Sequence, residues 1–400
     1  MTYSSPHNTL SNKIMANKKA RVIAYYLPQF HPTPENDKFW GKGFTEWTNV
    51  GRARPLFRGH YQPRVPADLG YYDLRMPEIR EQQAELAREA GIEGFCYWHY
   101  WFGGGKELLE RPFNEVVESG KPDFPFCLGW ANHTWSTRTW TSSKTGYQET
   151  IIAEMTYPGD EDHISHFYKY LNAFKDKRYI KVDGKLLFVI FAPQDFVDFP
   201  HFKDLWNKLA EKEGLKGFHF VGLTENFRLH TSDGKIRNVF SPKDASGDYY
   251  NHILSLGFDA VNSRGGNGAQ AKSDSPLIYY LKRFIQNKLH IDYVLHIDYA
   301  KIIRNYYVEN DKMENVYPTI IPNFDRSPRS GKKTNNIWHG STPELFGEMV
   351  EQALDLIKDK QDEHKILFLQ SWNEWGEGNY MEPDLKFGHG YIDILGKLVK

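Results

Sequence analysis

The sequence predicts one α/β domain: a (β/α)8 TIM barrel with elongated loops after its strands. About eight apolar or aromatic segments of strand length alternate with segments of helical apolar spacing, and such alternation is typical of a parallel sheet. Eight strand–helix units favour closure into a barrel. The alternative is an open, doubly wound sheet, which predicts a Gly-rich phosphate-binding turn after the first strand. Here that turn reads LPQFHP and has no glycine, so the barrel is favoured.

The first half of the chain contains four of the expected strands, each rich in β-branched or aromatic residues. They are expected at residues 22–30, 94–101, 124–132 and 186–191. The helices between them carry apolar residues at helical spacing, and several have Pro near the start or Gly after the end. They are expected at residues 76–90, 107–119, 160–175 and 202–213. Residues 31–72 form a long loop, and loops of that length are usually functional.

The second half repeats the alternation. Strands are expected at residues 218–223, 258–262 and 317–324 and from Ile366 onward. Helices are expected at residues 249–256, 277–308 and 343–358, with Thr342 as N-cap of the third, and from about Tyr391 to the end. The stretch 263–275 is rich in Gly, Ser, Asn and Ala and reads as a flexible loop, and residues 326–333 form a basic loop.

Composition and charge exclude several classes of partner. Of 400 residues, 40% are hydrophobic, which permits a sizeable core. Fifty basic residues face 51 acidic ones, so no electrostatic case exists for nucleic acid or an anionic membrane surface. Aromatic residues reach 15%. Ordinary core packing accounts for most of them, and the surplus could line a carbohydrate cleft, because sugar C–H faces pack on aromatic rings.

The chain ends and the cysteines bear on location. Residues 1–20 are polar and have no apolar segment of a signal peptide, and no apolar run is long enough to span a membrane. Cys96 and Cys127 both lie in apolar runs and read as buried thiols in a reducing compartment. We therefore expect a cytoplasmic protein with a disordered extension at residues 1–19 and a barrel domain at residues 20–400.

The most informative stretch is ILFLQSWNEWGEGNYMEP, residues 366–383. A buried strand gives way to a Gly-punctuated turn with Glu374 and Glu377 three residues apart, beside indole rings that would raise a carboxyl pKa by desolvation. Acidic residues in a turn are usually just solvated. Barrel enzymes, however, place their chemistry at the carboxyl ends of strands, and two carboxylates there suit acid/base chemistry on a sugar.

Other polar and aromatic residues follow the remaining strands and would share the same end of the barrel. The candidate substrate-binding residues are Tyr26, Gln29, His31, Glu46, Trp47, His99, Tyr100, Trp101, Asn132, Trp135, Glu225, Asn373 and Trp375. Each alone has an ordinary explanation; His99, for instance, reads first as a hydrogen-bonded wall residue.

Metal binding is a competing use for His31, His99, His133 and His339. No HExxH or paired-Cys spacing supports it. The sequence also lacks a GxSxG motif, a P-loop and a Cys nucleophile signature. We therefore expect neither a metal nor a cofactor.

Several long motifs resemble the WbsX-type, glycoside hydrolase family 99-like proteins. They are VIAYYLPQFHP (22–32), FWGKGFTEWTN (39–49), GHYQP (59–63), GFCYWHYW (94–101), KVDGK (181–185) and WNEWGEG (372–378). The resemblance runs from about residue 20 to residue 390. Family 99 contains retaining endo-α-mannosidases on a (β/α)8 barrel, while WbsX proteins accompany polysaccharide or O-antigen assembly and are often described as glycosyltransferases.

The resemblance implies roles for the acidic pair. Glu374 would act as base toward the sugar's own 2-hydroxyl, which attacks C1 to give a 1,2-anhydro intermediate. Glu377 would protonate the leaving oxygen and then activate the incoming water or acceptor. The chain departs from the mannosidases at Gly376, where they usually carry His. If the turn does not supply both acids, Glu225 is the best substitute partner.

The leading hypothesis is therefore a carbohydrate-active enzyme, an α-mannosidase-like retaining glycoside hydrolase or transglycosylase acting on an oligosaccharide or polysaccharide. Two alternatives stay open: a glycosyltransferase of polysaccharide biosynthesis, and a non-catalytic glycan-binding barrel. The first would need a diphosphate site, for which no DxD-like motif is evident.

Overall fold

The computed structural model describes residues 18–136, 150–224, 228–230, 236–238, 247–273, 281, 284, 294–334 and 337–400. In this part of the chain, eight parallel strands follow one another around a closed barrel, and the last pairs with the first. They are β1 (Arg21–Tyr26), β2 (Gly94–Trp101), β4 (Phe126–Trp130), β8 (Lys185–Ile190), β9 (Phe218–Leu223), β12 (Ala260–Ser263), β14 (Val316–Ile320) and β16 (Ile366–Leu369). The predicted (β/α)8 barrel is confirmed.

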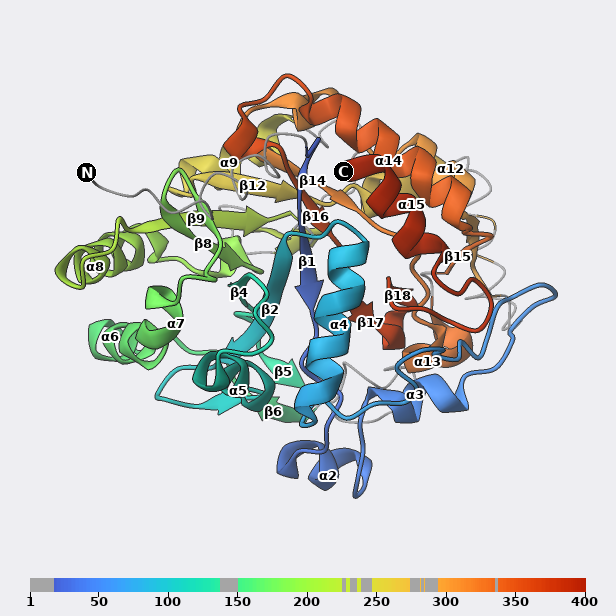
Figure 1. Cartoon of the computed structure of the whole chain (residues 1–400), viewed down its shortest axis with the longest axis horizontal. Helices are drawn as coiled ribbons and strands as arrows, with labels where there is room; N and C mark the ends of the chain where they lie inside the picture. Colours follow the sequence, from blue (N-terminus) through green and yellow to red (C-terminus); the bar gives the residue numbers. More distant parts are fainter. Residues whose placement is uncertain are drawn as a thin grey trace, which may run out of the picture.

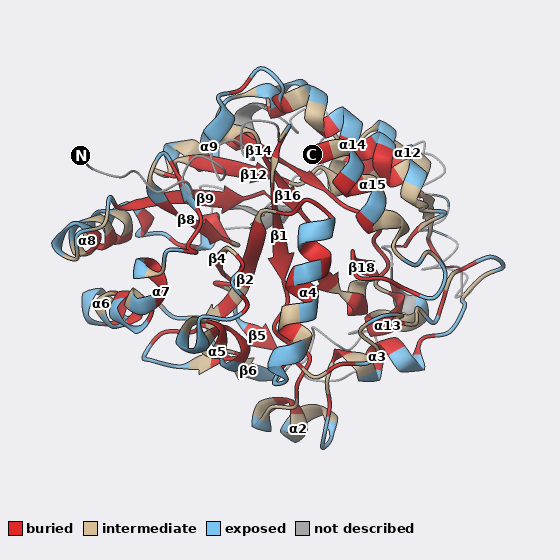
Figure 2. Ribbon diagram, viewed as in Figure 1, coloured by how far each residue is buried: buried red, intermediate tan, exposed pale blue. Residues whose placement is uncertain are grey.

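Helices surround the barrel (Figure 1). They are α4 (Pro77–Glu89), α5 (Arg111–Ser119), α6 (Asp160–Lys169), α7 (Leu171–Lys175), α8 (Phe199–Lys212), α9 (Gly247–Ser255), α10 (Gly266–Ser273), α12 (Tyr299–Arg304), α14 (Pro343–Ile357) and α15 (Gly390–Val399). Figure 2 shows the strands buried along their lengths while α4, α8 and α14 expose their outer faces. The core therefore lies inside the barrel and between the strands and the helices. Side chains alternate between the two faces of a strand and repeat every 3.6 residues along a helix, so both layers can be filled.

Short elements decorate the loops. The helices among them are α2 (Pro34–Trp40), α3 (Glu46–Arg52) and α13 (Ser327–Ser330). The short strands are β3 (Glu107–Leu108), β5 (Trp135–Ser136), β6 (Ile151–Ala153), β7 (Lys181–Val182), β10 (Arg228–His230), β11 (Ile236–Asn238), β13 (Ile297–Asp298), β15 (Trp338–His339), β17 (Asn373–Glu374) and β18 (Asn379–Tyr380). In Figure 1 the β1 arrow points down, toward the part of the molecule that holds α2, α3, α13 and β17. The carboxyl end of the barrel thus carries the elaborate loops.

The expected element bounds need some corrections. Residues 31–72 contain α2 and α3 rather than only loop, and β1 ends at Tyr26 instead of continuing to residue 30. The helix expected at 107–119 begins only at Arg111, after the short β3. Of the helix expected at 277–308, the structure describes α12 and the preceding β13, while most of residues 274–293 lie outside the described part.

The largest correction is at residues 263–275, expected as a flexible loop, where the structure forms α10. Ala269 of this helix is fully buried in a cluster with Tyr299 and Ile302 of α12. Gly265 lies directly under the backbone of Tyr306, because a Cβ there would be 1.8 Å from the Tyr306 carbonyl oxygen. Tertiary packing therefore overrides the low helix propensity of a Gly-rich segment.

We expect Gly265→Ala to destabilise the protein by about 1–3 kcal/mol, because the added methyl would force the β12–α10 turn away from Tyr306. The matched control is Gly268→Ala in the same helix, where a Cβ meets no atom within 4 Å. That change should be neutral or stabilising by up to about 1 kcal/mol. Chemical denaturation of both variants measures the difference, and equal stabilities would contradict this account of the turn.

Candidate functional site

A cavity of about 400 Å³ opens at the carboxyl end of the barrel. Side chains that follow β1, β2, β4, β8, β12, β14 and β16 line it. They are Tyr25, Leu27, Gln29, Trp98, Tyr100, Ala131, His133, Trp135, Phe191, Arg264, Asn267, Phe324, Arg326, Arg329, Gln370, Ser371, Glu374, Glu377 and Asn379. The lining combines aromatic rings, amides and a group of charged residues, a mixture typical of small-molecule sites.

The two predicted acids stand on the loop after β16. The chain forms a small hairpin in which Glu374 of β17 pairs with Asn379 of β18, and Asn373 pairs with Tyr380. Directly paired residues of an antiparallel ladder project to the same face, and successive pairs to opposite faces. Glu374 and Asn379 accordingly line the cavity, while Asn373 and Tyr380 face the core.

Asn373 ties this hairpin to the first strand. Its side-chain oxygen accepts a hydrogen bond from the Leu27 amide at 2.8 Å, and its side-chain nitrogen donates to the Leu27 carbonyl at 3.0 Å. The Glu374 amide donates to the Ser371 hydroxyl at 3.0 Å. These bonds satisfy buried backbone groups, and they fix where Glu374 projects.

Arg329 of α13 binds three carboxylates at once. Its Nη2 lies 2.5 Å from Oε1 of Glu46 and 2.5 Å from Oε1 of Glu374, and its Nη1 lies 2.5 Å from Oε1 of Glu377. The Arg329 side chain is 7% exposed and that of Glu46 is 0% exposed. A planar guanidinium with five donors can bridge several acids in this way. Glu374 and Glu377 are thereby held side by side, with Glu46 behind them.

The position of Arg329 depends on Asp325, which begins the same loop. The Asp325 carboxylate contacts His60 at 2.8 Å, accepts from Gln62 at 2.7 Å, and caps the loop through the Ser327 amide at 2.9 Å. Its own amide donates to the Glu377 carbonyl at 2.6 Å. Although burial opposes ionisation, the His60 contact and nearby Arg64 lower the pKa of Asp325. The loop is therefore anchored by an ionised side chain.

Gly376 lets the acids and Arg329 approach. A Cβ at this position would lie 2.1 Å from Oε2 of Glu46 and 2.9 Å from Nε of Arg329. Such distances are far below contact, so no side chain fits while Glu46 is in place. Gly376, where the chain departs from the mannosidase pattern, thus leaves room for the Glu46 carboxylate.

The charges around the two acids separate their pKa values. Burial raises the pKa of Glu374 well above its usual value; Arg329 opposes this rise, and the charges of Glu377 and Glu46 add to it. Burial acts in the same direction on Glu377, but Arg329 and Arg326 outweigh it and lower the pKa. Arg326 adds a contact at 3.2 Å from Glu377. At any given pH, Glu374 therefore holds its proton more tightly than Glu377 does.

A further buried acid, Glu382, supports the turn from behind. It accepts hydrogen bonds from the Trp375 indole at 2.6 Å, Gln83 at 2.6 Å and the Tyr72 hydroxyl at 2.9 Å. Burial raises its pKa to about 7, and these hydrogen bonds limit the rise. Glu382 orients Trp375, which stacks on Tyr380 at a centroid distance of 3.6 Å.

The structure brings several predicted residues together. Glu374, Glu377, Gln29, Tyr100 and Trp135 line the cavity. The rings of Tyr100 and Trp135 stack with their centroids 5.8 Å apart and form an aromatic wall. Glu46 is close to the acids through Arg329 but is fully buried behind it.

Three predicted residues on the first two strands face the helices instead, and His31, after the first strand, also lies outside the cavity. The Tyr26 hydroxyl donates to Gln83 of α4 at 2.6 Å. His99 contacts His166 of α6 at 2.9 Å, and burial lowers its pKa to about 3. Trp101 donates to Asp162 at 3.0 Å. His31 is buried outside the cavity lining, and burial lowers its pKa to about 4.

Four more hold loops in place. The Trp47 indole donates a hydrogen bond to the Tyr72 carbonyl at 2.7 Å. The Asn132 side chain donates to the Ala192 carbonyl and accepts from the Ala192 amide. Asn373 and Trp375 orient the hairpin as described above. Glu225 lies outside the described residues.

The cavity-lining residues that the sequence did not identify are explained by the alternation of side chains between the two faces of a strand. Tyr25, Leu27 and Gln29 point inward together, as do Trp98 and Tyr100, because alternate strand residues share a face. Tyr25 rather than Tyr26 was the residue to choose. Arg329 lies in a stretch that the sequence identifies only as a basic loop, and no motif around it indicates its contacts with the acids.

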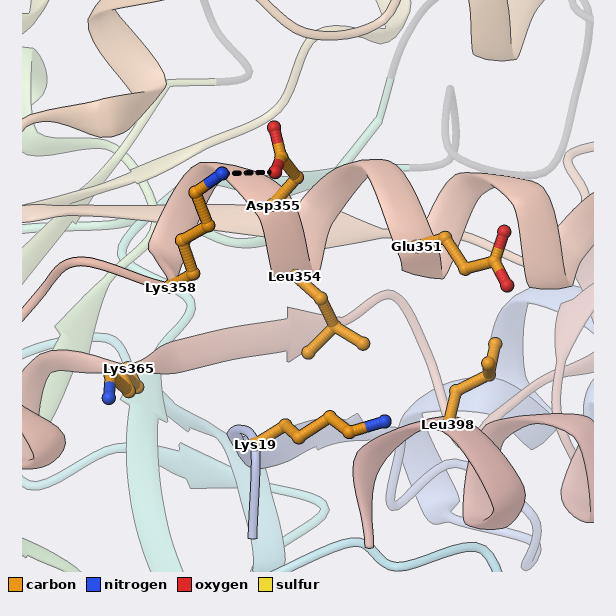
Figure 3. Close-up of a pocket in the computed structure, with 7 residues that line it drawn as sticks. All are labelled: Lys19, Glu351, Leu354, Asp355, Lys358, Lys365 and Leu398. Atoms are coloured by element: carbon orange, nitrogen blue, oxygen red, sulfur yellow. Dashed lines mark hydrogen bonds and ion pairs between the residues drawn. The ribbon is translucent and has the colours of Figure 1, made fainter.

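A metal site and a cavity at the opposite end of the barrel are the other candidates to compare with this cavity. Within the described ranges, no group of three His, Cys, Asp or Glu residues is placed to hold a metal ion. A second cavity, of about 440 Å³, lies near the amino ends of β1 and β16 and is drawn in Figure 3. Its lining residues are Lys19, Glu351, Leu354, Asp355, Lys358, Lys365 and Leu398. Barrel enzymes place their active sites at the carboxyl end of the strands, so the cavity at the amino end is the weaker candidate.

A family model described as "Glycosyltransferase WbsX" matches residues 22–395. The chain belongs to the WbsX family. The resemblance inferred from the motifs is confirmed. "Uncharacterized protein WxcX" of Xanthomonas campestris pv. campestris is 31% identical over 376 residues, which cover 94% of this chain and 49% of WxcX; a second strain gives the same result. This WbsX chain thus spans about half the length of the curated relatives it matches.

Solved structures share the barrel. A "glycoside hydrolase-like protein" superimposes with a TM-score of 0.53 at 15% identity, covering 96% of this chain and 95% of that one. An endo-alpha-mannosidase of family 99 from Bacteroides thetaiotaomicron gives a TM-score of 0.52 at 13% identity, covering 95% and 96%. At these identities the likeness concerns the fold. No helix among the described residues has the length and apolar character needed to cross a membrane.

We expect Arg329→Gln to destabilise the folded protein by about 3–5 kcal/mol at neutral pH, because it leaves three buried carboxyl groups without their cation. The loss should be smaller at pH 5, because protonation of the carboxyl groups relieves their repulsion. Without Arg329, the folded state binds protons more tightly than the unfolded chain does. The stability of the variant therefore falls as pH rises. Adding Glu46→Gln should recover part of the loss. Denaturation midpoints at pH 5 and 8 test this, and a pH-independent loss would contradict it.

Glu382 gives a second pH-dependent effect. Its pKa is about 7 in the folded protein against 4.5 ordinarily, a displacement that corresponds to about 3 kcal/mol at most. Because the folded pKa is the higher one, this contribution is complete below pH 4.5 and is lost as pH rises through 7. Glu382→Gln cannot ionise, so its melting temperature relative to wild type should rise between pH 5 and pH 8. A constant difference across that range would show that Glu382 does not titrate there.

Proposed function

We propose that this protein cleaves or transfers a glycosyl unit, with Glu374 and Glu377 as the acid/base pair. The observation that carries the proposal is the meeting of two carboxyl groups, whose pKa values are shifted in opposite directions, in an aromatic-lined cavity at the carboxyl end of a barrel. Pairs of acids whose surroundings separate their pKa values are typical of glycosidic-bond chemistry. Membership of the WbsX family supports it.

The directions of the two pKa shifts favour one division of labour. Glu374, whose pKa is raised, donates a proton to the leaving oxygen as the bond from C1 breaks. Glu377, whose pKa is lowered, accepts the proton of the sugar's 2-hydroxyl as that oxygen bonds to C1. This division reverses the one that the family 99 resemblance implies. It follows from the charges, because Glu377 has Arg326 as well as Arg329 beside it while Glu374 shares Arg329 with Glu46.

The second half of the reaction restores both groups. An incoming hydroxyl gives its proton to Glu374, now a carboxylate, and its oxygen bonds to C1 on the face the leaving group occupied. The 1,2-anhydro ring opens, and the 2-oxygen takes its proton back from Glu377. Each proton returns to where it began, and the anomeric configuration is retained.

The nature of the incoming hydroxyl separates hydrolysis from transfer. Water gives a glycoside hydrolase, and a sugar hydroxyl gives a transglycosylase. The description of the WbsX family favours transfer, whereas the fold is shared with a family 99 endo-alpha-mannosidase. An α-linked, mannose-like unit is the substrate class we propose for the first trials.

Glu374→Gln and Glu377→Gln should each lower kcat by about 10²–10⁴-fold on an alkyl or disaccharide α-glycoside, because each removes one proton-transfer step. With a glycosyl fluoride or dinitrophenyl glycoside, whose leaving group needs no proton, Glu374→Gln should lose far less activity than Glu377→Gln. Rates on both substrate types measure this, with Glu351→Gln at the opposite barrel end as the control.

Two outcomes count against the proposal. Unchanged turnover by both Gln variants would remove the pair from the chemistry. A leaving-group dependence confined to Glu377→Gln would restore the division of labour that the resemblance implies.

A further inference from the structure

Three arginines line one side of the cavity. Arg264 follows β12, and Arg326 and Arg329 follow β14, the strand that pairs with β12. Among the described residues, Glu374 and Glu377 are the acids of the same lining, and Arg329 contacts both of them. The proposed reaction assigns no role to Arg264, and it gives Arg326 only an effect on the pKa of Glu377.

The guanidinium of Arg264 is positioned by its neighbours. The Arg264 amide donates to the Thr224 hydroxyl at 2.8 Å, and the next residue, Gly265, lies under the Tyr306 carbonyl. The guanidinium lies over the Tyr25 ring, 4.9 Å from the ring centroid. Such stacking engages the face of a guanidinium, whereas its N–H donors lie in its plane. A side chain positioned in this way loses little conformational entropy when it binds a ligand.

Arg326 reaches the cavity with part of its side chain exposed. Its Nε lies 3.2 Å from Oε1 of Glu377, and the side chain is 33% exposed. The same carboxylate also contacts Nη1 of Arg329, so two guanidiniums share it. Arg264 is half-buried and lines the same cavity. A ligand that enters the cavity can therefore reach both Arg264 and Arg326.

The charges at this side of the cavity favour an additional anion. Burial would raise the pKa of Glu377, but the charges of all three arginines lower it, so all three lie near that carboxyl group. Burial raises the pKa values of Glu374 and Glu46. At a given pH these two acids therefore carry less negative charge than ordinary carboxyl groups would.

The chemistry of a guanidinium selects the ligand. It offers five N–H donors and no acceptor, in a planar fork that matches the oxygens of a carboxylate or a phosphate. The aromatic wall of Tyr100 and Trp135 follows β2 and β4, which lie opposite β12 and β14 in the barrel. A sugar ring can pack on such a wall. A ligand that combines a sugar ring with an oxyanion would therefore suit both sides of the cavity.

We propose that Arg264 and Arg326 form an oxyanion-binding subsite beside Glu377, which holds a carboxylate or phosphate group carried by the glycan. The substrate is then an acidic saccharide whose charged group lies close to the bond that is cleaved or transferred. This assignment of a substrate rests on the proposed function, whereas anion binding by the two arginines does not. Arg264 and Arg326 bind the substrate and transfer no proton.

Calorimetry in the Glu374→Gln background, where turnover is slowed, measures the binding of acidic and neutral ligands. The probes are methyl α-pyranosides of mannose, glucose and galactose, with the corresponding uronic acids and 6-phosphates. In at least one series, we expect an acidic member to bind about tenfold more tightly than the neutral one, because charge-assisted hydrogen bonds are the stronger ones. Added salt should weaken the acidic ligands selectively. The uronic acids and the 6-phosphates distinguish a carboxylate from a phosphate.

Arg264→Gln and Arg326→Gln should each weaken the acidic ligand about tenfold and leave the neutral one unchanged. Arg264→Lys keeps the charge without the planar fork, so it should retain only part of the affinity. Arg304→Gln is the matched control, because Arg304 is exposed on α12 outside the cavity lining and the change removes the same charge. Melting temperatures show whether each variant folds. Arg326, which is partly exposed, provides the same test if Arg264→Gln impairs folding.

The outcomes separate the subsite from the catalytic proposal. Absence of binding, equal affinity for neutral and acidic members, or an equal loss of both in the arginine variants overturns the subsite and leaves the acid/base pair in place. Tighter binding of uridine or guanosine diphosphate than of every acidic glycoside also overturns it, because the anion would then belong to a nucleotide. Selective loss of the acidic ligands, with no turnover of any glycoside by the wild-type protein, supports the subsite and contradicts the catalytic proposal.

Discussion

The contact of one guanidinium with three carboxylates is the constraint on which this barrel end depends. Arg329 binds Glu46, Glu374 and Glu377, which come from two segments far apart in the chain. Three acids this close would repel one another in a medium of low dielectric constant, and their pKa values would rise together. The cation lets them share a buried space. The loop that carries it must therefore be fixed as firmly as the acids are, which explains the buried Asp325 anchor contacting His60 and Gln62.

The asymmetry around the acids matters more than their proximity. Arg329 contacts both catalytic candidates, whereas the ion pair of Arg326 is with Glu377. An additional cation closer to one of two chemically identical groups gives them different pKa values. The fold supplies this asymmetry through chain order, because Arg326 and Arg329 lie on the same short segment after β14 and only one face of the hairpin meets it. The two acids therefore differ in pKa without a carboxylate from a second strand and without a side chain of a different type.

The sequence predicted the barrel and the acidic pair because both leave local signals. Alternating apolar segments mark the strands, and WNEWGEG interrupts a buried run with charged groups. The other cavity residues were harder. Tyr26 and Tyr25 are equivalent in composition, and only the phase of the strand relative to the barrel axis, a tertiary property, selects Tyr25. His99 and Trp101 were placed in the cavity for the same reason, although their partners are His166 and Asp162 of α6. Arg329 depends on contacts across 283 residues of chain, which no window of sequence contains.

The absence of a side chain at Gly376 constrains a residue outside the turn, Glu46. Because a Cβ at Gly376 would meet Oε2 of Glu46 at 2.1 Å, a side chain at position 376 requires the Glu46 carboxylate to move or to be absent. We therefore expect the residues at these two positions to covary among homologues.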